Sequence, residues 1–110
     1  MNDLVTEIKD RCRLLDVAVS ESKKRGQKYA EAEQAYRVAL AKAILSARDN
    51  GTPVTIISDV CRGSAEIAKL RFDRDCAEVV YKSAQEAINS MKLQIRLLDN
   101  QLEREWGAAK

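Results

Sequence analysis

The seven-residue repeat of apolar residues between Ala65 and Trp106 constrains the fold of this chain more than any other feature. One position of the repeat holds Ile67, Arg74, Tyr81, Ile88, Ile95 and Leu102, and the other holds Leu70, Ala77, Ala84, Met91, Leu98 and Glu105. A repeat sustained over this many turns is typical of a helix that packs along its length against another helix. We therefore expect a helix over about 65–106, roughly 60 Å long at about 1.5 Å per residue.

A weaker form of the same repeat fills the first half of the chain. Its positions are Val5, Ile8, Cys12, Leu15, Val19, Ser22, Gly26, Tyr29, Glu33, Tyr36, Leu40, Ala43 and Ala47. No proline interrupts residues 3–49, so we expect one helix over about that range. Gly26 costs about 1 kcal/mol relative to alanine inside a helix, which leaves open whether it breaks the helix. Gly51 in "DNG" ends the helix, because glycine adopts the left-handed conformation at little cost.

The stretch "NGTPVTIISDVCRGS" separates the two repeats and contains the only proline of the chain. Its signals predict a short helix over about 53–61, capped by Thr52 and with Pro53 in the first helical position. Gly63 then ends this helix, and Ser64 caps the next one. We interpret the unusual residues of this stretch as a structural corner, made of Gly51, Thr52, Pro53, Gly63 and Ser64.

Two helices of similar length joined by a compact corner should fold back into an antiparallel hairpin. The predicted fold is therefore all-α: a long, coiled-coil-like hairpin with a short helix at the corner. A chain of 110 residues makes one domain of this kind, over residues 1–110. In this arrangement we expect Tyr36 near Tyr81 and Trp106 near Ile8.

Both long helices carry a second apolar stripe on the side away from the repeat that joins them. A lone hairpin would leave this stripe in water, and contiguous exposed apolar surface usually marks a protein contact. We therefore predict self-association, most simply of two hairpins into a four-helix bundle. The alternative is a first helix bent near Gly26 that covers part of the stripe. The residues of the stripe are Leu14, Val17, Ala35, Val38 and Leu45 on the first helix and Phe72, Cys76, Val79, Leu93 and Leu97 on the second.

The composition gives little support to catalysis. The chain has no histidine, the usual general base and metal ligand near neutral pH, and it has no glycine-rich phosphate loop or paired-cysteine motif. Its three cysteines are widely spaced and indicate reduced thiols of a cytosolic protein. No apolar run is long enough to span a membrane, and the N-terminus lacks a secretory pattern. We expect no enzyme, no cofactor, no metal, no membrane contact and no small-molecule substrate.

Charged residues near the corner have structural interpretations. Asp73 and Asp75 point about 200° apart on a helix, so they cannot share one metal ion. Arg74 stands in a mostly apolar repeat. We expect it to pair with Glu33 across the hairpin or to fix the register, as a polar residue in a helix interface can do at some cost in stability.

Nucleic-acid binding is the main competing function. The segment "IISDVCRGSAEIAKL" has the outline of a helix-turn-helix motif, although acidic residues nearby dilute its positive field. A second basic segment, "SKKRGQK", spreads its charges around more than half of the helix circumference, and the formal net charge of +2 selects no partner. The candidate phosphate or partner contacts are Lys23, Lys24, Arg25 and Lys28 in the first helix and Arg62, Lys69 and Arg71 at the corner.

Two segments, "AEAEQAYRVALAKAILSARDNGTPVTIISDVCRG" and "EIAKLRFDRDCAEVVYKSAQEAINSMKLQIRLLDNQLEREW", resemble a family of small, largely uncharacterised proteins encoded by phages and prophages of Gram-positive bacteria. The similarity covers nearly the whole chain after about residue 25, and "YRVALAK", "GTPVT" and "RDCAEVVY" are its most specific pieces. The resemblance implies a gene of the early region, near replication and recombination functions. It also implies a protein that acts by binding in the cytoplasm of the bacterial host, and it brings no catalytic residues.

The sequence therefore predicts a non-catalytic protein that forms a homodimer and docks on a phage or host protein. Candidate targets are the recombination and replication machinery or a host defence complex. One alternative is a nucleic-acid-binding accessory protein that uses the corner or the Lys23–Lys28 patch, for which a steep salt dependence of DNA binding would be diagnostic. Another is a virion assembly or scaffolding component, for which concentration-dependent higher oligomers would be the sign.

Overall fold

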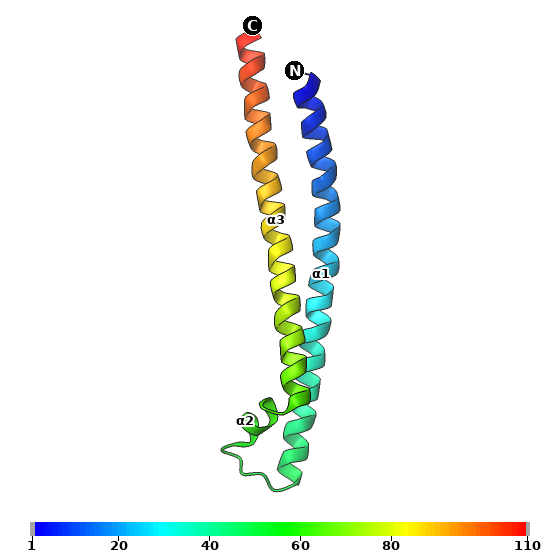
Figure 1. The fold of residues 1–110 in the computed structure, drawn as a ribbon, viewed down its shortest axis with the longest axis vertical. Helices are drawn as coiled ribbons and strands as arrows, with labels where there is room; N and C mark the ends of the chain where they lie inside the picture. The colour runs from blue at the N-terminus through cyan, green and yellow to red at the C-terminus, as the bar shows by residue number, and fades with distance from the viewer. Residues whose placement is uncertain (1, 110) are drawn as a thin grey trace. The chain divides into compact units, whose positions relative to one another are not determined.

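The computed structural model describes residues 2–109 and contains three helices: α1 (Asn2–Asp49), α2 (Ile57–Arg62) and α3 (Ala65–Ala109) (Figure 1). The helices divide into two compact units. The terminal unit comprises Met1–Lys24 and Lys82–Lys110, and the corner unit comprises Arg25–Tyr81. In each unit a segment of α1 packs antiparallel against a segment of α3, so the predicted all-α helical hairpin is confirmed. The expectation of one domain stays a prediction.

The helix α1 ends as the sequence predicts. Gly51 has a φ of +85°, the left-handed conformation that glycine adopts without a steric penalty. Its N–H donates to the carbonyl of Arg48 at 3.0 Å, and the N–H of Thr52 donates to the carbonyl of Ala47 at 2.9 Å. These two bonds form a Schellman motif, which satisfies carbonyls that the end of the helix leaves without partners.

The start of the corner helix differs from the prediction. α2 begins at Ile57 and not at Pro53, and Thr52 does not cap it, because the position before α2 is Ile56 and no side chain caps it. Residues 53–56 form a turn instead, closed by the N–H of Ile56 and the carbonyl of Pro53 at 3.1 Å. The β-branched residues that follow Pro53 have a weak helix preference, so the helix starts only where Ile57 is buried.

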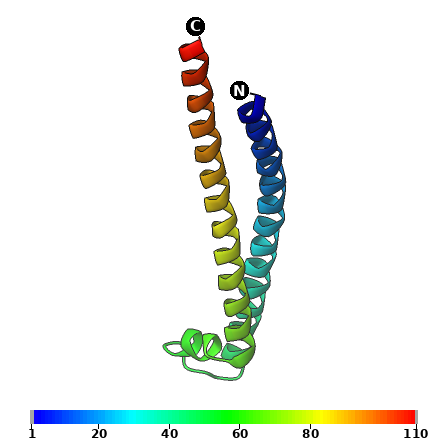
Figure 2. The ribbon, with the colours of Figure 1, turned by 45° about the horizontal axis from the view of Figure 1, so that its top comes forward.

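The start of α3 confirms the second cap. The N–H of Ile67 donates to the Ser64 hydroxyl at 3.4 Å, and that hydroxyl donates to the carbonyl of Cys61 at 2.9 Å. Gly63 is the residue after α2, in a right-handed conformation with a φ of −82°. In the corner unit, α2 and its loop lie beside the start of α3 (Figure 2), and Ile57 and Cys61, one helical turn apart, are both buried.

The repeat in α3 is confirmed at every position. All twelve of its residues are buried or half-buried, and Glu78 is the one other α3 residue with a described side chain that is not exposed. In α1 the repeat is correct from Leu15 onward, but Val5 and Cys12 are exposed while their neighbours Leu4 and Arg11 are half-buried. A straight α-helix drifts by about 20° per seven residues relative to an ideal repeat, which moves the contact face to the adjacent position.

In the corner unit, the register of the two helices differs from the prediction by one repeat. Tyr81 lies beside Tyr29, with 6.2 Å between the ring centroids, and not beside Tyr36. In the terminal unit, the Arg11 guanidinium donates to the side-chain amide oxygen of Gln94. Arg11 also lines a concavity with Leu98 and Gln101, so the expected proximity of Trp106 to Ile8 stays a prediction.

Gly26 sits within the unbroken helix α1 and faces the Tyr81 ring. A Cβ atom added to Gly26 would lie 3.0 Å from Cε1 and 3.1 Å from Cζ of Tyr81. The glycine therefore does not break the helix; it lets α1 approach a large aromatic side chain closely.

Candidate functional site

The second apolar stripe is exposed along its whole length. The exposed fractions are 62% for Phe72 and 64% for Val79, compared with 47% for Val38 and 56% for Leu45 in the same unit. The helix α1 covers none of these side chains, so the alternative of a bent first helix that hides the stripe is wrong. In the terminal unit the exposed stripe residues are Leu14, Val17, Leu93 and Leu97, and in the corner unit they are Ala35, Val38, Leu45, Phe72, Cys76 and Val79.

The corner unit presents its apolar residues on two separate faces. Phe72 and Val79 each precede a residue of the helix–helix contact by two positions, and two positions correspond to about 200° around a helix. Val38 follows the buried Tyr36 by two positions in the same way. The outer side of α3 and the outer side of α1 therefore face away from each other. We name the residues Phe72, Cys76 and Val79 the α3 outer patch.

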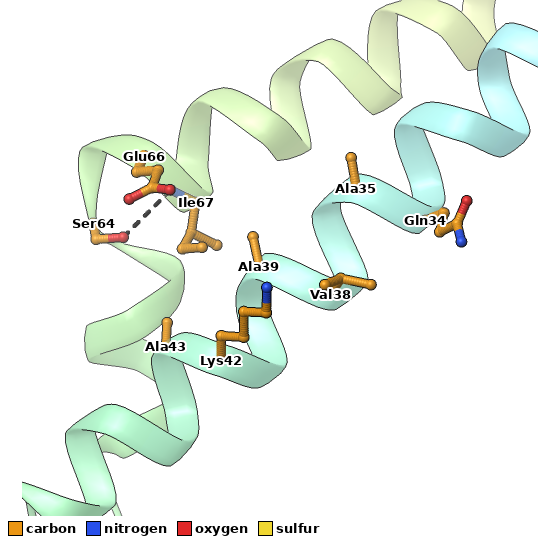
Figure 3. A pocket seen from close by; sticks show the side chains of 9 residues that line it. All are labelled: Gln34, Ala35, Val38, Ala39, Lys42, Ala43, Ser64, Glu66 and Ile67. Atoms are coloured by element: carbon orange, nitrogen blue, oxygen red, sulfur yellow. Dashed lines mark hydrogen bonds between the residues drawn. The ribbon is translucent and has the colours of Figure 1, made fainter.

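A shallow apolar groove lies beside the contact between α1 and the start of α3 (Figure 3). Small side chains of α1 leave room there opposite Ile67, and Lys42 and Glu66 supply its charged groups. The groove has a volume of about 550 Å³ and belongs wholly to the corner unit. It is lined by Gln34, Ala35, Val38, Ala39, Lys42, Ala43, Ser64, Glu66 and Ile67.

The core of the single chain is small. Four apolar side chains are buried among residues 3–108, namely Tyr36, Ile57, Cys61 and Ile67, and all four belong to the corner unit. None of the described side chains is less than 2% exposed, whereas fourteen large apolar residues are exposed. Two packed helices with a core this small bury little apolar surface for their length.

A second concavity in the corner unit gathers arginine side chains. Its volume is about 470 Å³, and it is lined by Glu33, Tyr36, Arg37, Leu40, Arg62, Arg71 and Arg74. We name it the arginine pocket. The four arginines come from all three helices, so the fold of the corner unit brings them together.

Glu33 connects two of the arginines of this pocket. It lies 2.6 Å from Arg37 Nε and 3.3 Å from Arg74 Nη1. The Arg74 guanidinium also lies 4.7 Å from the centroid of the buried Tyr36 ring, within the range of a cation–π interaction. The predicted pairing of Arg74 with Glu33 is confirmed, and these contacts fix the Arg74 side chain in one orientation.

The remaining charges of the arginine pocket are less compensated. Asp75 accepts a bond from Arg74 Nη2 at 2.8 Å and lies 4.0 Å from Arg71 Nε. Among the residues that the structure describes, Arg62 has no ion-pair partner. The four arginines of the pocket carry four positive charges, and Glu33 and Asp75 supply two negative charges to them. These groups together therefore have an excess of positive charge.

The carboxyl group of Glu33 responds to this environment. Its hydrogen bond from Arg37 and the nearby charge of Arg74 hold its pKa below the ordinary value of 4.5. On α1 one turn before it, burial raises the pKa of Tyr29, and the neighbouring negative charge of Glu78 adds to that rise.

The lowered pKa of Glu33 predicts a pH dependence of stability. A carboxyl with a depressed pKa in the folded state stabilises the fold above its unfolded pKa, and this contribution disappears as the pH falls through the folded pKa. We therefore expect wild type to be more stable than Glu33→Gln above about pH 4.5, with the difference shrinking toward zero in more acidic solution. Urea denaturation of both proteins at a series of pH values measures it, and a difference independent of pH would contradict it.

The predicted basic residues do not form one site. The structure brings Arg62 and Arg71 together in the arginine pocket, but Lys69 lies outside it and pairs with Asp73 at 2.7 Å. Within "SKKRGQK", Lys23 and Lys24 belong to the terminal unit, whereas Arg25 and Lys28 belong to the corner unit. None of the pockets described above includes any of these four residues.

Sequence reasoning missed two features of the corner unit. Arg37 lines the arginine pocket although it lies outside the apolar repeat, and its spacing of four residues from Glu33 was the available signal. Val54, Ile56 and Val60 of the corner are exposed, so much of the β-branched run around the corner helix remains open to solvent in this chain.

Comparisons with known proteins found no relative of this chain. No family model, no curated protein and no solved structure matches the chain. Within residues 2–109, no three side chains of the metal-ligating types gather as a metal ion would need. The described helices also include none that is long and apolar enough to cross a membrane.

Proposed function

We propose that this protein is a non-catalytic interaction module that associates with a second copy of itself and then docks on another protein. One observation carries the proposal: the described chain buries four apolar side chains but exposes fourteen large ones. Exposed apolar residues that recur at helical spacing usually mark a protein contact. Association would supply the burial that the single hairpin lacks.

The α3 outer patch is the proposed contact between the two copies. Phe72 is the largest exposed apolar side chain of the corner unit, and large aromatic residues dominate the energetics of many interfaces. Two-fold symmetry is the commonest symmetry of homodimers. A two-fold axis through the patch would pack α3 against α3 of the second copy. The corner units would then contribute four long helical segments to one assembly, with the outer side of α1 of each copy left uncovered, which is a more open arrangement than the four-helix bundle that the sequence analysis expects.

This arrangement leaves the outer side of α1 and its apolar groove open for a different protein. The resemblance of the sequence to phage and prophage proteins supports a partner encoded by a phage or its host. Recombination and replication proteins and host defence complexes are the candidates. The proposed function needs no catalytic step, in keeping with a chain that has no histidine.

The solution mass of wild type and Val79→Glu tests the proposal. We expect wild type to scatter light as a dimer of 12.3-kDa chains and Val79→Glu to be a folded monomer, because a carboxylate in the patch must lose its water on association. Val54→Glu is the matched control, since Val54 is 79% exposed in the same unit but lies outside the patch. It should remain a dimer.

Two results would contradict the proposed interface. Wild type that stays a monomer would leave the α3 outer patch without a second copy. A wild-type mass that rises beyond a dimer with concentration would favour an assembly or scaffolding component instead.

A further inference from the structure

We propose that the arginine pocket binds a phosphate monoester. The inference goes beyond self-association, because it concerns a ligand of different chemistry on a part of the corner unit that the α3 outer patch does not include. Four arginine residues from three helices line one concavity of about 470 Å³. Guanidinium groups bind phosphate oxygens through paired hydrogen bonds, which makes arginine the preferred residue for phosphate recognition.

The charge balance of the pocket favours a dianion. Glu33 and Asp75 compensate two of the four positive charges through their pairs with Arg37, Arg71 and Arg74. The remaining excess of two positive charges matches a phosphate monoester, which carries a charge of about −1.5 to −2 near neutral pH. A nucleic-acid phosphate is a diester and carries a single negative charge. A carboxylate also carries a single negative charge. Either group would therefore leave part of the positive excess uncompensated.

Two arginines are available to the ligand and two are held in place. Arg62 has no ion-pair partner among the described residues, and Arg71 has only the 4.0 Å contact with Asp75. Arg74 is held by Glu33 and by the Tyr36 ring, so the wall of the pocket is ordered before any ligand arrives. A site prepared in this way loses less conformational entropy on binding.

The pocket favours recognition of the phosphate group over recognition of a base. The Tyr36 side chain is 6% exposed and one face of its ring is taken by Arg74, so it offers no stacking surface to a nucleotide base.

The experiment is an NMR-monitored titration of the full chain with three monoester probes and one diester probe. The monoester probes are inorganic phosphate, phosphoserine and AMP, and the diester probe is a short DNA duplex. We expect the monoesters to shift the amide signals around Arg62 and Arg71 saturably. The relative affinities of phosphoserine and AMP then distinguish a modified protein side chain from a small phosphorylated metabolite as the source.

Variants decide whether the arginine pocket is responsible. The double variant Arg62→Gln/Arg71→Gln should weaken phosphate binding at least about tenfold. Lys69→Gln is the matched control, because it removes a positive charge from the same part of α3 outside the pocket, and it should change the affinity by less than about twofold. Arg62→Lys/Arg71→Lys keeps the charges but loses the planar fork, and it should bind with intermediate affinity.

Three results would overturn the proposal. They are the absence of saturable shifts with any monoester, an unchanged affinity in a folded Arg62→Gln/Arg71→Gln variant, and tight binding of the duplex without binding of the monoesters. Circular dichroism of each variant establishes that it is folded. If the double variant does not fold, the Lys variant and the wild-type titration still decide the outcome.

Discussion

Replacing Gly26 with leucine should destabilise the corner unit by about 1–3 kcal/mol, the usual cost of forcing a larger side chain into a packed contact. A Cβ atom at this position would already lie 3.0 Å from the Tyr81 ring, and the rest of the leucine side chain has to displace that ring. The gain in helix preference of leucine over glycine, about 0.8 kcal/mol, offsets only part of this cost. Urea denaturation followed by circular dichroism at one fixed protein concentration measures the change.

Two further variants isolate the contact with Tyr81. Gly107 is also helical, but a Cβ atom there would meet nothing within 4 Å, so Gly107→Leu should leave stability unchanged or raise it. Adding Tyr81→Ala to Gly26→Leu removes the clash, so the double variant should be more stable than the sum of the two single effects predicts. Additive effects would show that Gly26 and Tyr81 do not meet.

Ile67→Ala should cost about 2–4 kcal/mol, because removing buried methylene groups loses their transfer free energy and leaves a cavity. Ile67 is the most buried apolar side chain of the described chain, at 3% exposed. It lies where α3 begins and packs toward the small side chains of α1 (Figure 3). The loss should appear as a lower denaturation midpoint with an unchanged slope.

Val54→Ala is the control for this prediction. Val54 is 79% exposed, so its truncation should change the free energy of unfolding by no more than about 0.5 kcal/mol. If Ile67→Ala were as mild as Val54→Ala, the contact between α1 and the start of α3 would not be a core of this fold.

The apolar repeat was sufficient to predict the face of α3 but not the register of the hairpin. A shift of seven residues keeps every repeat position on the same face, so periodicity alone cannot distinguish Tyr29 from Tyr36 as the neighbour of Tyr81. The fit between Gly26 and the Tyr81 ring, a tertiary contact, distinguishes them. The Arg74–Glu33 pair was predictable because a charged side chain in an apolar repeat needs a partner.

The candidate sites were predictable to different degrees. The exposed stripe follows from helical spacing alone, because residues two positions from a contact residue point away from the contact. The arginine pocket does not follow from spacing. It requires Arg37 of α1, Arg62 of α2 and Arg71 of α3 to meet, and that depends on where α2 packs. The prediction for the start of α2 was wrong. Thr52 and Pro53 have the residue types of a helix start, but the helix begins at Ile57, where Ile57 and Cys61 become buried.

Cross-linking of Cys76 tests the central proposal, self-association through the α3 outer patch, most directly. Cys76 is a free, exposed thiol within the patch, Cys12 is the other exposed thiol, and Cys61 is buried. In a Cys12→Ser background, a two-fold axis through the patch should bring Cys76 close to its copy. A short bis-maleimide is then expected to join two chains, and adding Val79→Glu should abolish the product. Complete modification of Cys76 with only single chains recovered would contradict the account.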